Sequence, residues 1–500
     1  MSERFDVIVV GLGPVGAVLA GLLGQAGLHV LAMERSHEVY PLPRAAHFDH
    51  EIMRVFQQLG IADEVLTHSR PAGAYEFRNA KGELLMSARR GGEQGVSGWS
   101  NSYMFNQPGI ERALRSRLAA MPNVIVRLGL AFQTHAQQDD HVAVTAQDDA
   151  GNAETFEARY LVGCDGAWSP VREMLKIGLE DYQFDEPWLV VDTIPRAPTN
   201  LPTVNLQICD PARPTTCVLM GPGRHRWEFM MLPGETAENV LAPGFVETLL
   251  AGWQVDVEVE RKAVYRFHGL IAERWREGRV LIAGDAAHQM PPFAGQGMCS
   301  GIRDAANLAW KLEAILRHGA EEAILDTYQA ERDRSVRDYI ELAIGMGRVV
   351  CTLDPAVAAH RDAEMMGRRD AEEAPAPVGG PGLNGGLFAE NDEAAGRIFP
   401  QFIGADGARL DDALDGRAWL IDADGGGSTA GLRRIATGDP LLAPFRSNLT
   451  AWLRTLGGDA VLVRPDRYVF GVGDAQDLLA SWHAAAGDDA PHAMAQETQI

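Results

Sequence analysis

The start of the chain alternates between strand-like and helix-like patterns. Val7 to Val10 is a run of β-branched apolar residues that ends at Gly11, and Pro14 to Gln25 has the length and composition of a helix. Gly27 follows at the position of a helix-ending glycine, and His29 to Met33 is a second apolar run of strand length. This succession predicts a βαβ unit.

The middle of the chain changes its pattern twice. Glu51 to Leu59 and Gly109 to Ala120 are predicted helices, whereas apolar residues from Trp188 to Phe267 recur mostly at every second position. That period of two predicts an antiparallel sheet with one apolar face. Arg279 to Ala283 then predicts a buried strand, and Gln296 to Leu316 carries apolar residues at helical spacing. The chain therefore returns to an α/β layer.

The last part of the chain is predicted to be a separate unit. Asp354 to Gly386 is rich in Ala, Pro and Gly, which is typical of a surface connection. Beyond it, Ala418 to Asp422 and Ala460 to Arg464 are strand-like, and a helix is predicted to begin near Asp474. This small α/β unit contains no cysteine, so we expect a structural or oligomeric role for it rather than a redox role.

Composition restricts the classes of function. The formal net charge of -23 and the pI near 5.0 argue against binding to nucleic acid or to an anionic membrane, because both need clustered cations. The five cysteines form no CxxC pair and no metal-ligand spacing, so we expect a cytoplasmic protein without a metal site. Val7 to Met33 is the longest uncharged stretch, but six glycines interrupt it, unlike a membrane span. The class of function that remains is chemistry on a small molecule.

A glycine-rich turn joins the first predicted strand to the first predicted helix. Gly11, Gly13 and Gly16 form a GxGxxG pattern that includes Pro14. The glycines allow a tight turn, and the helix N-terminus offers free N–H groups to a pyrophosphate. Glu34 ends the second strand, where a carboxylate accepts hydrogen bonds from ribose hydroxyls and repels a 2'-phosphate. The pattern predicts a dinucleotide site that disfavours NADP and leaves FAD and NAD open.

Two later segments favour FAD over NAD. Tyr160 to Gly166 and Arg279 to Asp285 are each a buried strand that ends in a turn with Gly and Asp. The second continues through a further glycine-rich loop, Ala286 to Met298, into the long predicted helix. The N-terminus of that helix can hold the far end of an extended cofactor and stabilise negative charge there. A reduced flavin develops such charge.

Together these motifs resemble a known family, the single-component FAD-dependent aromatic hydroxylases with the p-hydroxybenzoate hydroxylase fold. The chain is most similar to the 3-(3-hydroxyphenyl)propionate hydroxylases and related phenol and polyketide hydroxylases. The resemblance covers residues 4 to about 350 and reappears near the C-terminus. It rests on the GxGxxG pattern, Pro43-Arg44-Ala45, Gln107, Cys164-Asp165-Gly166, the run from Gly284 to Leu312, and Arg464 to Tyr468.

The resemblance implies an α/β fold with interleaved domains. A Rossmann-like FAD-binding domain would comprise residues 1–72, 98–182 and 270–350. A mostly antiparallel substrate-binding sheet would comprise residues 73–97 and 183–269. A helical or linker segment, 351–386, would lead to a C-terminal thioredoxin-like α/β domain, 387–500.

The resemblance also implies the reaction and the cofactor contacts. Hydride would pass from NADH or NADPH to FAD, and a flavin hydroperoxide formed with dioxygen would hydroxylate a small phenolic substrate. The chain carries one dinucleotide fingerprint, so the nicotinamide is expected to bind transiently, and a homodimer is compatible with the sequence. The residues implied to contact FAD are Gly11, Gly13, Pro14, Gly16, Glu34, Arg35, Arg44, Gln107, Asp165, Asp285, Pro292, Gly295, Gly297 and Met298.

A catalytic base is expected beside the flavin. A phenolate reacts faster than a phenol with electrophilic oxygen, and an imidazole with its ordinary pKa near 6.5 suits that proton transfer. His47 follows Arg44 in the segment that passes the flavin edge in this family, so we expect it to help deprotonate the substrate. Asp49 and Tyr265 are alternative catalytic residues, and a purely structural histidine is the competing interpretation.

One predicted strand carries the candidate substrate contacts. Trp227, Phe229 and Met231 share a face that is expected to cover an aromatic ring, although a plain core role fits them equally well. Arg226, on the other face, is a candidate anchor for a substrate carboxylate and equally a candidate for an ion pair with an acid such as Glu228.

Two other functions use the same first fingerprint. A flavin-dependent halogenase is disfavoured because the chain has no WxWxIP segment and no suitably placed lysine. A flavin-binding sensor or interaction protein remains the alternative from a different class, and stimulation of NAD(P)H oxidation by a phenol would separate it from an enzyme.

Overall fold

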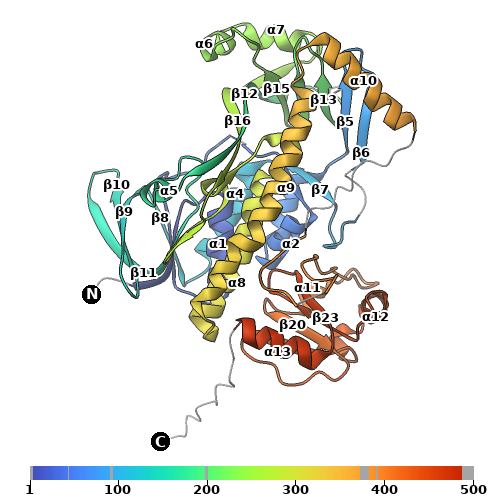
Figure 1. Cartoon of the computed structure of the whole chain (residues 1–500). Helices are drawn as coiled ribbons and strands as arrows, with labels where there is room; N and C mark the ends of the chain where they lie inside the picture. The colour runs from blue at the N-terminus through green and yellow to red at the C-terminus, as the bar shows by residue number, and fades with distance from the viewer. Residues whose placement is uncertain are drawn as a thin grey trace, which may run out of the picture.

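The computed structural model describes residues 4–42, 44–89, 94–197, 201–371, 382–389 and 392–486. The described strands form two eight-stranded sheets, one four-stranded sheet and one three-stranded sheet. In Figure 1 the two large sheets occupy the upper and left parts of the molecule, and the four-stranded sheet belongs to a separate unit at the lower right.

A largely parallel sheet forms the cofactor layer. Ile8 of β1 (Arg4–Val10) pairs with Leu31 of β2 (Val30–Glu34) and with Leu161 of β11 (Ala153–Gly163), and all three side chains are buried. Because helices cover this sheet, its central strands are apolar along their length. The predicted βαβ unit is confirmed, with α1 at Pro14–Gln25. The other elements of this layer are β8 (Val124–Leu128), β9 (Leu130–Gln137), β10 (Val142–Asp148), β17 (Arg276–Glu277), β18 (Val280–Ile282), α4 (Gln107–Ala119), α5 (Pro170–Met174) and α8 (Gly297–His318).

A three-stranded sheet lies at the edge of this layer and carries the segment with His47. β3 (His47–Asp49) and β4 (Ser69–Pro71) both pair with β7 (Ser102–Phe105). Two helices, α2 (His50–Gln58) and α3 (Ala62–Thr67), connect β3 to β4. The strand pairing places His47 beside Met104 and Asp49 beside Ser102 in register.

The second large sheet is antiparallel except where β13 runs parallel to β5. Its strands, in sheet order, are β19 (His288–Gln289), β16 (Val257–Ala272), β12 (Leu179–Pro195), β15 (His225–Met230), β14 (Thr215–Leu219), β13 (Asn205–Cys209), β5 (Ala74–Asn79) and β6 (Leu84–Arg89). One face packs under two short helices, α6 (Ala237–Leu241) and α7 (Phe245–Ala251), in an apolar cluster of its own. The other face lines the cavity described below.

Long helices connect the units. α9 (Asp326–Val350) runs from the cofactor layer to the antiparallel sheet, and α10 (Pro355–Asp370) follows it beside β6 (Figure 1). Asp354 caps α10 by accepting hydrogen bonds from the N–H groups of Ala356 and Val357. Part of the expected surface connection is therefore a helix, and residues 372–381 lie outside the described part. Within that part no single helix has the length and composition to span a membrane, and one pair bent by 115°, Glu322–Val350 with Pro355–Asp370, has them only jointly.

The C-terminal unit is a mixed four-stranded sheet with helices. β20 (Ala418–Asp422) runs parallel to β21 (Leu432–Ala436) and antiparallel to β22 (Ala460–Val463), which pairs with β23 (Val469–Gly473). The helices are α11 (Leu410–Ala413), α12 (Arg446–Thr455) and α13 (Ala475–Ala486). The unit has a separate apolar core that includes Phe399, Trp419 and Leu449.

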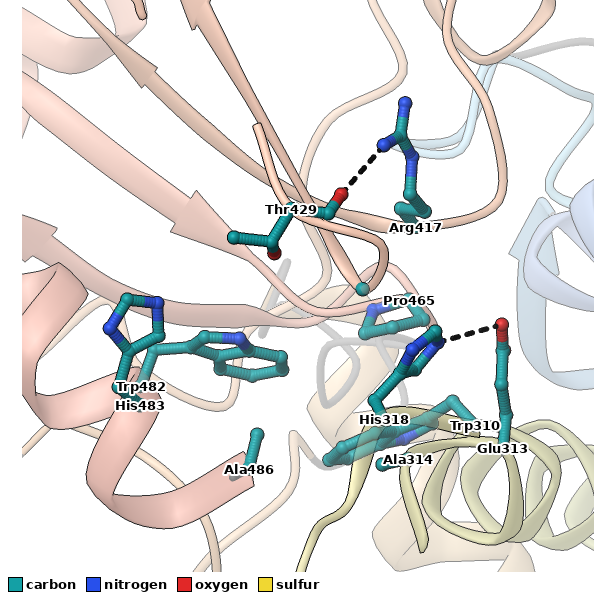
Figure 2. Close-up of a pocket in the computed structure, with 11 residues that line it drawn as sticks. Trp310, Glu313, Ala314, His318, Arg417, Thr429, Pro465, Trp482, His483 and Ala486 are labelled. Atoms are coloured by element: carbon teal, nitrogen blue, oxygen red, sulfur yellow. Dashed lines mark hydrogen bonds and ion pairs between the residues drawn. The ribbon is translucent and has the colours of Figure 1, made fainter. Parts of the chain in front are cut away.

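The seam between this unit and the cofactor layer is closed. Trp310 of α8 stacks on Trp482 of α13 at 5.8 Å, and Figure 2 shows both rings beside Pro465 and His318. The cavity there measures only about 30 Å³, which is room for a water molecule and not for a cofactor. Ion pairs also cross the seam, because Arg464 lies 2.7 Å from Glu331 and Arg54 lies 2.6 Å from Asp411.

Candidate active site

The GxGxxG turn leaves an open space in front of α1. Gly11 has φ +92°, and a Cβ on it would collide with the carbonyl of Cys164. A Cβ on Gly16 would collide with the Gly11 carbonyl, whereas a Cβ on Gly13 would meet nothing within 4 Å. No side chain caps the helix, so its first N–H groups face this space. Such a cradle fits the pyrophosphate of a dinucleotide.

Two backbone hydrogen bonds fix the orientation of the Glu34 carboxylate. One carboxylate oxygen accepts a hydrogen bond from the Leu12 N–H at 2.9 Å, and the other accepts from the Ser36 N–H at 3.0 Å. These bonds hold the carboxylate at the wall of the cavity beside Arg35, and each oxygen retains a lone pair for a ribose hydroxyl.

Two carboxyl groups meet where the parallel strands β11 and β18 end. Asp165 accepts from the Val171 N–H at 3.1 Å, while its other oxygen is buried without a hydrogen-bond donor among the described residues. Asp285 opens onto the cavity from a turn that is otherwise enclosed. Desolvation raises the pKa of both groups, although the nearby His288 and Arg44 oppose this effect at Asp285. A buried carboxyl oxygen without a donor fits the hydroxyl-rich ribityl chain of FAD.

Gln107 ties the segment with Arg44 to α4. Its side-chain oxygen accepts hydrogen bonds from the N–H groups of Arg44 and Ala45 at 2.9 and 2.6 Å, and its amide donates to Glu111. Gln107 lies at the cavity wall, and these bonds fix the course of the backbone that leads to His47.

The loop before α8 presents a second helix N-terminus to the cavity. Pro292–Ala294 forms a short 3-10 turn, Gly295 has φ +66°, and α8 begins at Gly297 without a side-chain cap. Its free N–H groups and helix dipole stabilise negative charge at this end of a ligand. Met298 and Pro292 complete this part of the wall.

One cavity of about 1440 Å³ joins these features. It exceeds the roughly 300–1,000 Å³ of a pocket for one drug-sized ligand, so it can hold a dinucleotide and a small substrate together. All the predicted FAD contacts line it except Gly16, which lies behind the turn and permits its close packing. The residues present therefore fit FAD.

His47 lies at the cavity wall with both ring nitrogens engaged. Its Nδ1 is 3.0 Å from the Gly295 carbonyl, and its Nε2 is 2.7 Å from the Ser102 hydroxyl. Because a carbonyl only accepts, Nδ1 carries the proton and Nε2 accepts from Ser102. Tyr265 also lines the cavity, with the Arg261 guanidinium 5.0 Å from its ring centre.

Asp49 does not reach the cavity, so its predicted catalytic role is corrected. Its carboxylate caps α2 by accepting from the N–H groups of Glu51 and Ile52, and it pairs with Arg303 at 2.5 Å. Although burial opposes ionisation, Arg303 holds the pKa of Asp49 well below its usual range. A carboxylate that is always ionised and bound in this way is structural.

The predicted substrate contacts on β15 lie on the wrong face of the sheet. Trp227, Phe229 and Met231 pack in the apolar cluster beneath α6 and α7, away from the cavity. The alternation along the strand is as predicted, but Arg226 and Glu228 are the residues that line the cavity. Both faces of β15 are buried, and hydrophobicity alone does not reveal which of them a ligand contacts.

Sequence reasoning missed a polar floor formed by the antiparallel sheet. Arg226 donates to Asp192 through Nε at 2.7 Å and to the Arg44 carbonyl through Nη1 at 2.7 Å, and Arg261 lies 3.6 Å from the same aspartate. Other polar residues of this sheet that line the cavity include Asn205, Gln207, Thr216 and Glu228 on the central strands and Arg266 and His268 on β16. Polar residues spaced by two were the available signal, but only the tertiary structure shows that Gln207, Thr216, Arg226 and Glu228 are buried.

Comparisons with known proteins agree with this geometry. A family model described as "FAD binding domain" matches residues 4–343. The chain is 41% identical to a "Probable NADH-specific resorcinol 4-hydroxylase" of Rhodococcus jostii (strain RHA1), over 95% of this chain and 93% of that protein. It is 32% identical to "3-(3-hydroxy-phenyl)propionate/3-hydroxycinnamic acid hydroxylase 2" of Burkholderia vietnamiensis (strain G4 / LMG 22486), over 100% and 99% of the two chains.

A solved structure supports the fold. The chain is similar to the flavin-dependent monooxygenase PieE in complex with FAD and substrate, with a TM-score of 0.79, 21% identity, and coverage of 97% of this chain and 99% of that one. The interleaved parallel and antiparallel sheets and the small C-terminal sheet are those of the p-hydroxybenzoate hydroxylase fold, which confirms the predicted fold class.

Proposed function

The chain belongs to the FAD binding domain family and is an NAD(P)H-dependent flavoprotein aromatic hydroxylase, and we propose that it hydroxylates an uncharged, resorcinol-type phenol with NADH as reductant. The enzymatic interpretation is confirmed over the sensor and halogenase alternatives. Whether it assembles as a homodimer stays a prediction.

The proposed class of substrate is based on the charges of the residues in the cavity floor. A phenol with a carboxylate side chain needs a cation in the cavity, because a buried unpaired charge is costly. Arg226 is already bound to Asp192 and to the Arg44 carbonyl, and Arg261 shares Asp192. These cations are thus neutralised or held within the protein. An uncharged hydroxybenzene suits such a floor, in agreement with the name of the Rhodococcus relative.

The proposed chemistry divides between cofactor and protein. Bound FAD supplies hydride uptake from NADH and the activation of dioxygen. Ser102 presents its hydroxyl oxygen to the cavity while donating its proton to His47 Nε2. A substrate hydroxyl bound to Ser102 Oγ can therefore pass its proton through Ser102 to His47, and Nδ1–H stays on the Gly295 carbonyl. Tyr265, held beneath Arg261, is proposed to contact the ring.

Product-analysed turnover with a small panel of phenols tests the proposal. We expect resorcinol to stimulate NADH oxidation more than 3-(3-hydroxyphenyl)propionate does, and to yield a trihydroxybenzene with one oxygen atom from labelled dioxygen. NADPH should be the poorer reductant. Preferred hydroxylation of the carboxylated phenol would overturn the substrate assignment, and a preference for NADPH would overturn the reductant.

A further inference from the structure

A buried carboxyl group stands in the middle of the cavity floor. Glu228 lies on β15, between Val190 of β12 and Thr216 of β14 in the sheet register. Its side chain faces the cavity, yet the residue is only 7% exposed. A carboxyl in such a place needs hydrogen-bond donors, which the protein or a ligand must supply.

The described residues direct their donors elsewhere. The Thr216 hydroxyl donates to the Gln207 side-chain oxygen at 2.7 Å, and Gln207 donates to the Tyr75 hydroxyl at 2.7 Å. Tyr75 in turn donates to the Phe293 carbonyl, in the loop before α8. This chain of hydrogen bonds leads away from Glu228 and orients three polar side chains along the floor.

Arg226 is also too far to serve as a hydrogen-bond donor to Glu228. Its Nη1 lies 2.7 Å from the Arg44 carbonyl but 3.8 Å from the Glu228 carboxylate, and its Nε and Nη2 donate to Asp192. Within the described part of the chain no group donates a hydrogen bond to Glu228. The open side of its carboxyl is the cavity.

We propose that Glu228 is the subsite for the second hydroxyl of a resorcinol-type substrate and the residue that excludes carboxylated phenols, an inference that rests on the proposed function. A ring hydroxyl supplies the missing donor without bringing a charge. The other hydroxyl remains for the Ser102 and His47 pair. A monohydroxylated ring would leave Glu228 unpaired, and a site built around a substrate hydroxyl rejects an analogue that lacks it.

The charges around Glu228 explain the exclusion of carboxylates. Arg226 on the same strand and Arg261 on β16 balance Asp192 on β12 and an ionised Glu228, while the neighbour on β14, Thr216, is uncharged. A substrate carboxylate would add an unpaired negative charge to this neutral group, and a hydroxyl would not. Burial raises the pKa of Glu228 to about 7, against the opposing effect of Arg226, so the acceptor is fully charged only above neutral pH.

Ligand binding to the oxidised holoenzyme, followed by perturbation of the flavin spectrum, tests the subsite without turnover. In Glu228→Leu we expect the Kd for resorcinol to rise about 10- to 100-fold, because a hydrogen bond to a charged acceptor is lost. The Kd for phenol should not rise, because the leucine removes the carboxyl that phenol leaves unpaired. Glu260→Leu is the matched control, since Glu260 lies on β16 of the same sheet but pairs with Arg224 outside the cavity. Equal shifts for both ligands, or no shift, would overturn the subsite.

Glu228→Gln separates charge from hydrogen bonding and covers the case in which the leucine variant does not fold. Its amide oxygen still accepts a hydroxyl, so the Kd for resorcinol should stay within about 10-fold of the wild-type value and lose its pH dependence near neutrality. Binding of 3-(3-hydroxyphenyl)propionate should tighten. Persistence of the pH dependence or unchanged exclusion of the carboxylate would contradict the assignment. A wild-type enzyme that does not hydroxylate resorcinol would refute the proposed function, whereas a wild-type enzyme that does, with variants that bind like it, would refute this inference alone.

Discussion

Replacing Arg464 by methionine tests the buried charges that join the C-terminal unit to the cofactor layer. Arg464 is completely buried, with its guanidinium 2.7 Å from Glu331 and 2.6 Å from Asp466. Burial alone would raise the pKa of Glu331, but Arg464 and Lys311 hold it down to about 2. Removing the guanidinium therefore takes away the larger of the two charges that lower the pKa of Glu331.

The expected loss follows from the partners that remain. Removing one member of a buried ion pair typically costs about 3–5 kcal/mol, because the other charge is left uncompensated. Lys311 still lies 2.9 Å from Glu331, and Asp466 keeps the indole N–H of Trp310 at 3.1 Å. We therefore expect the lower end of that range, about 3 kcal/mol of unfolding free energy.

Urea unfolding, followed by tryptophan fluorescence, measures this loss of unfolding free energy. If the two units unfold separately, the loss is read from the first transition. Trp310 reports directly, since the Arg464 guanidinium lies 5.0 Å from its ring. Arg334→Met is the matched control, because Arg334 is exposed and makes only an i,i+4 pair with Asp338, so its effect should stay within about 0.5 kcal/mol. If Arg464→Met cost less than about 1 kcal/mol, or no more than the control, the claim that the buried ion pairs of the seam stabilise the fold would be refuted.

Three further predictions concern the site. His47→Gln should lower product formation about 100-fold near pH 7 and raise the yield of uncoupled peroxide. His50→Gln is the control and should do neither, because His50 lies outside the cavity. An unchanged coupling ratio and pH profile in His47→Gln would refute the catalytic role of His47. Gly13→Val should leave the melting temperature of the apoprotein unchanged, because its Cβ meets only open space, but the variant should not retain flavin. Gly16→Val should fail to fold. Full flavin content in Gly13→Val would contradict the cradle. The unfolded chain releases the Glu228 proton near pH 4.5, and the folded protein releases it near pH 7. The unfolding free energy of the wild type relative to Glu228→Gln should therefore fall by about 3 kcal/mol as pH rises from 4.5 to 7. A pH-independent difference would disprove the burial of this carboxyl.

The cofactor half of the site was predictable because its signals are local. Gly11, Gly13 and Gly16 follow a strand and begin a helix, and Glu34 ends the next strand, so short-range backbone geometry defines the cradle. The loop from Asp285 to Met298 is likewise continuous in sequence and meets the same cavity. Parallel strands bring their carboxyl ends to one edge of a sheet, which is why residues far apart in the chain, such as Gly11 and Asp285, line one cavity.

The substrate half depended on contacts that no local pattern reveals. The period of two in β15 was visible, but whether Trp227 or Glu228 faced a ligand depended on α6 and α7 covering one face of the sheet and the cofactor layer approaching the other. Asp49 was an alternative catalytic residue because it lies close to His47 in the chain, and the distant Arg303 of α8 together with the N-terminus of α2 made it structural. The sequence by itself determined the elements and the cofactor turn, because these follow from residue spacing and backbone preference. The tertiary structure decided which polar groups became buried partners and which were left to contact a substrate, because burial depends on every element that packs around them.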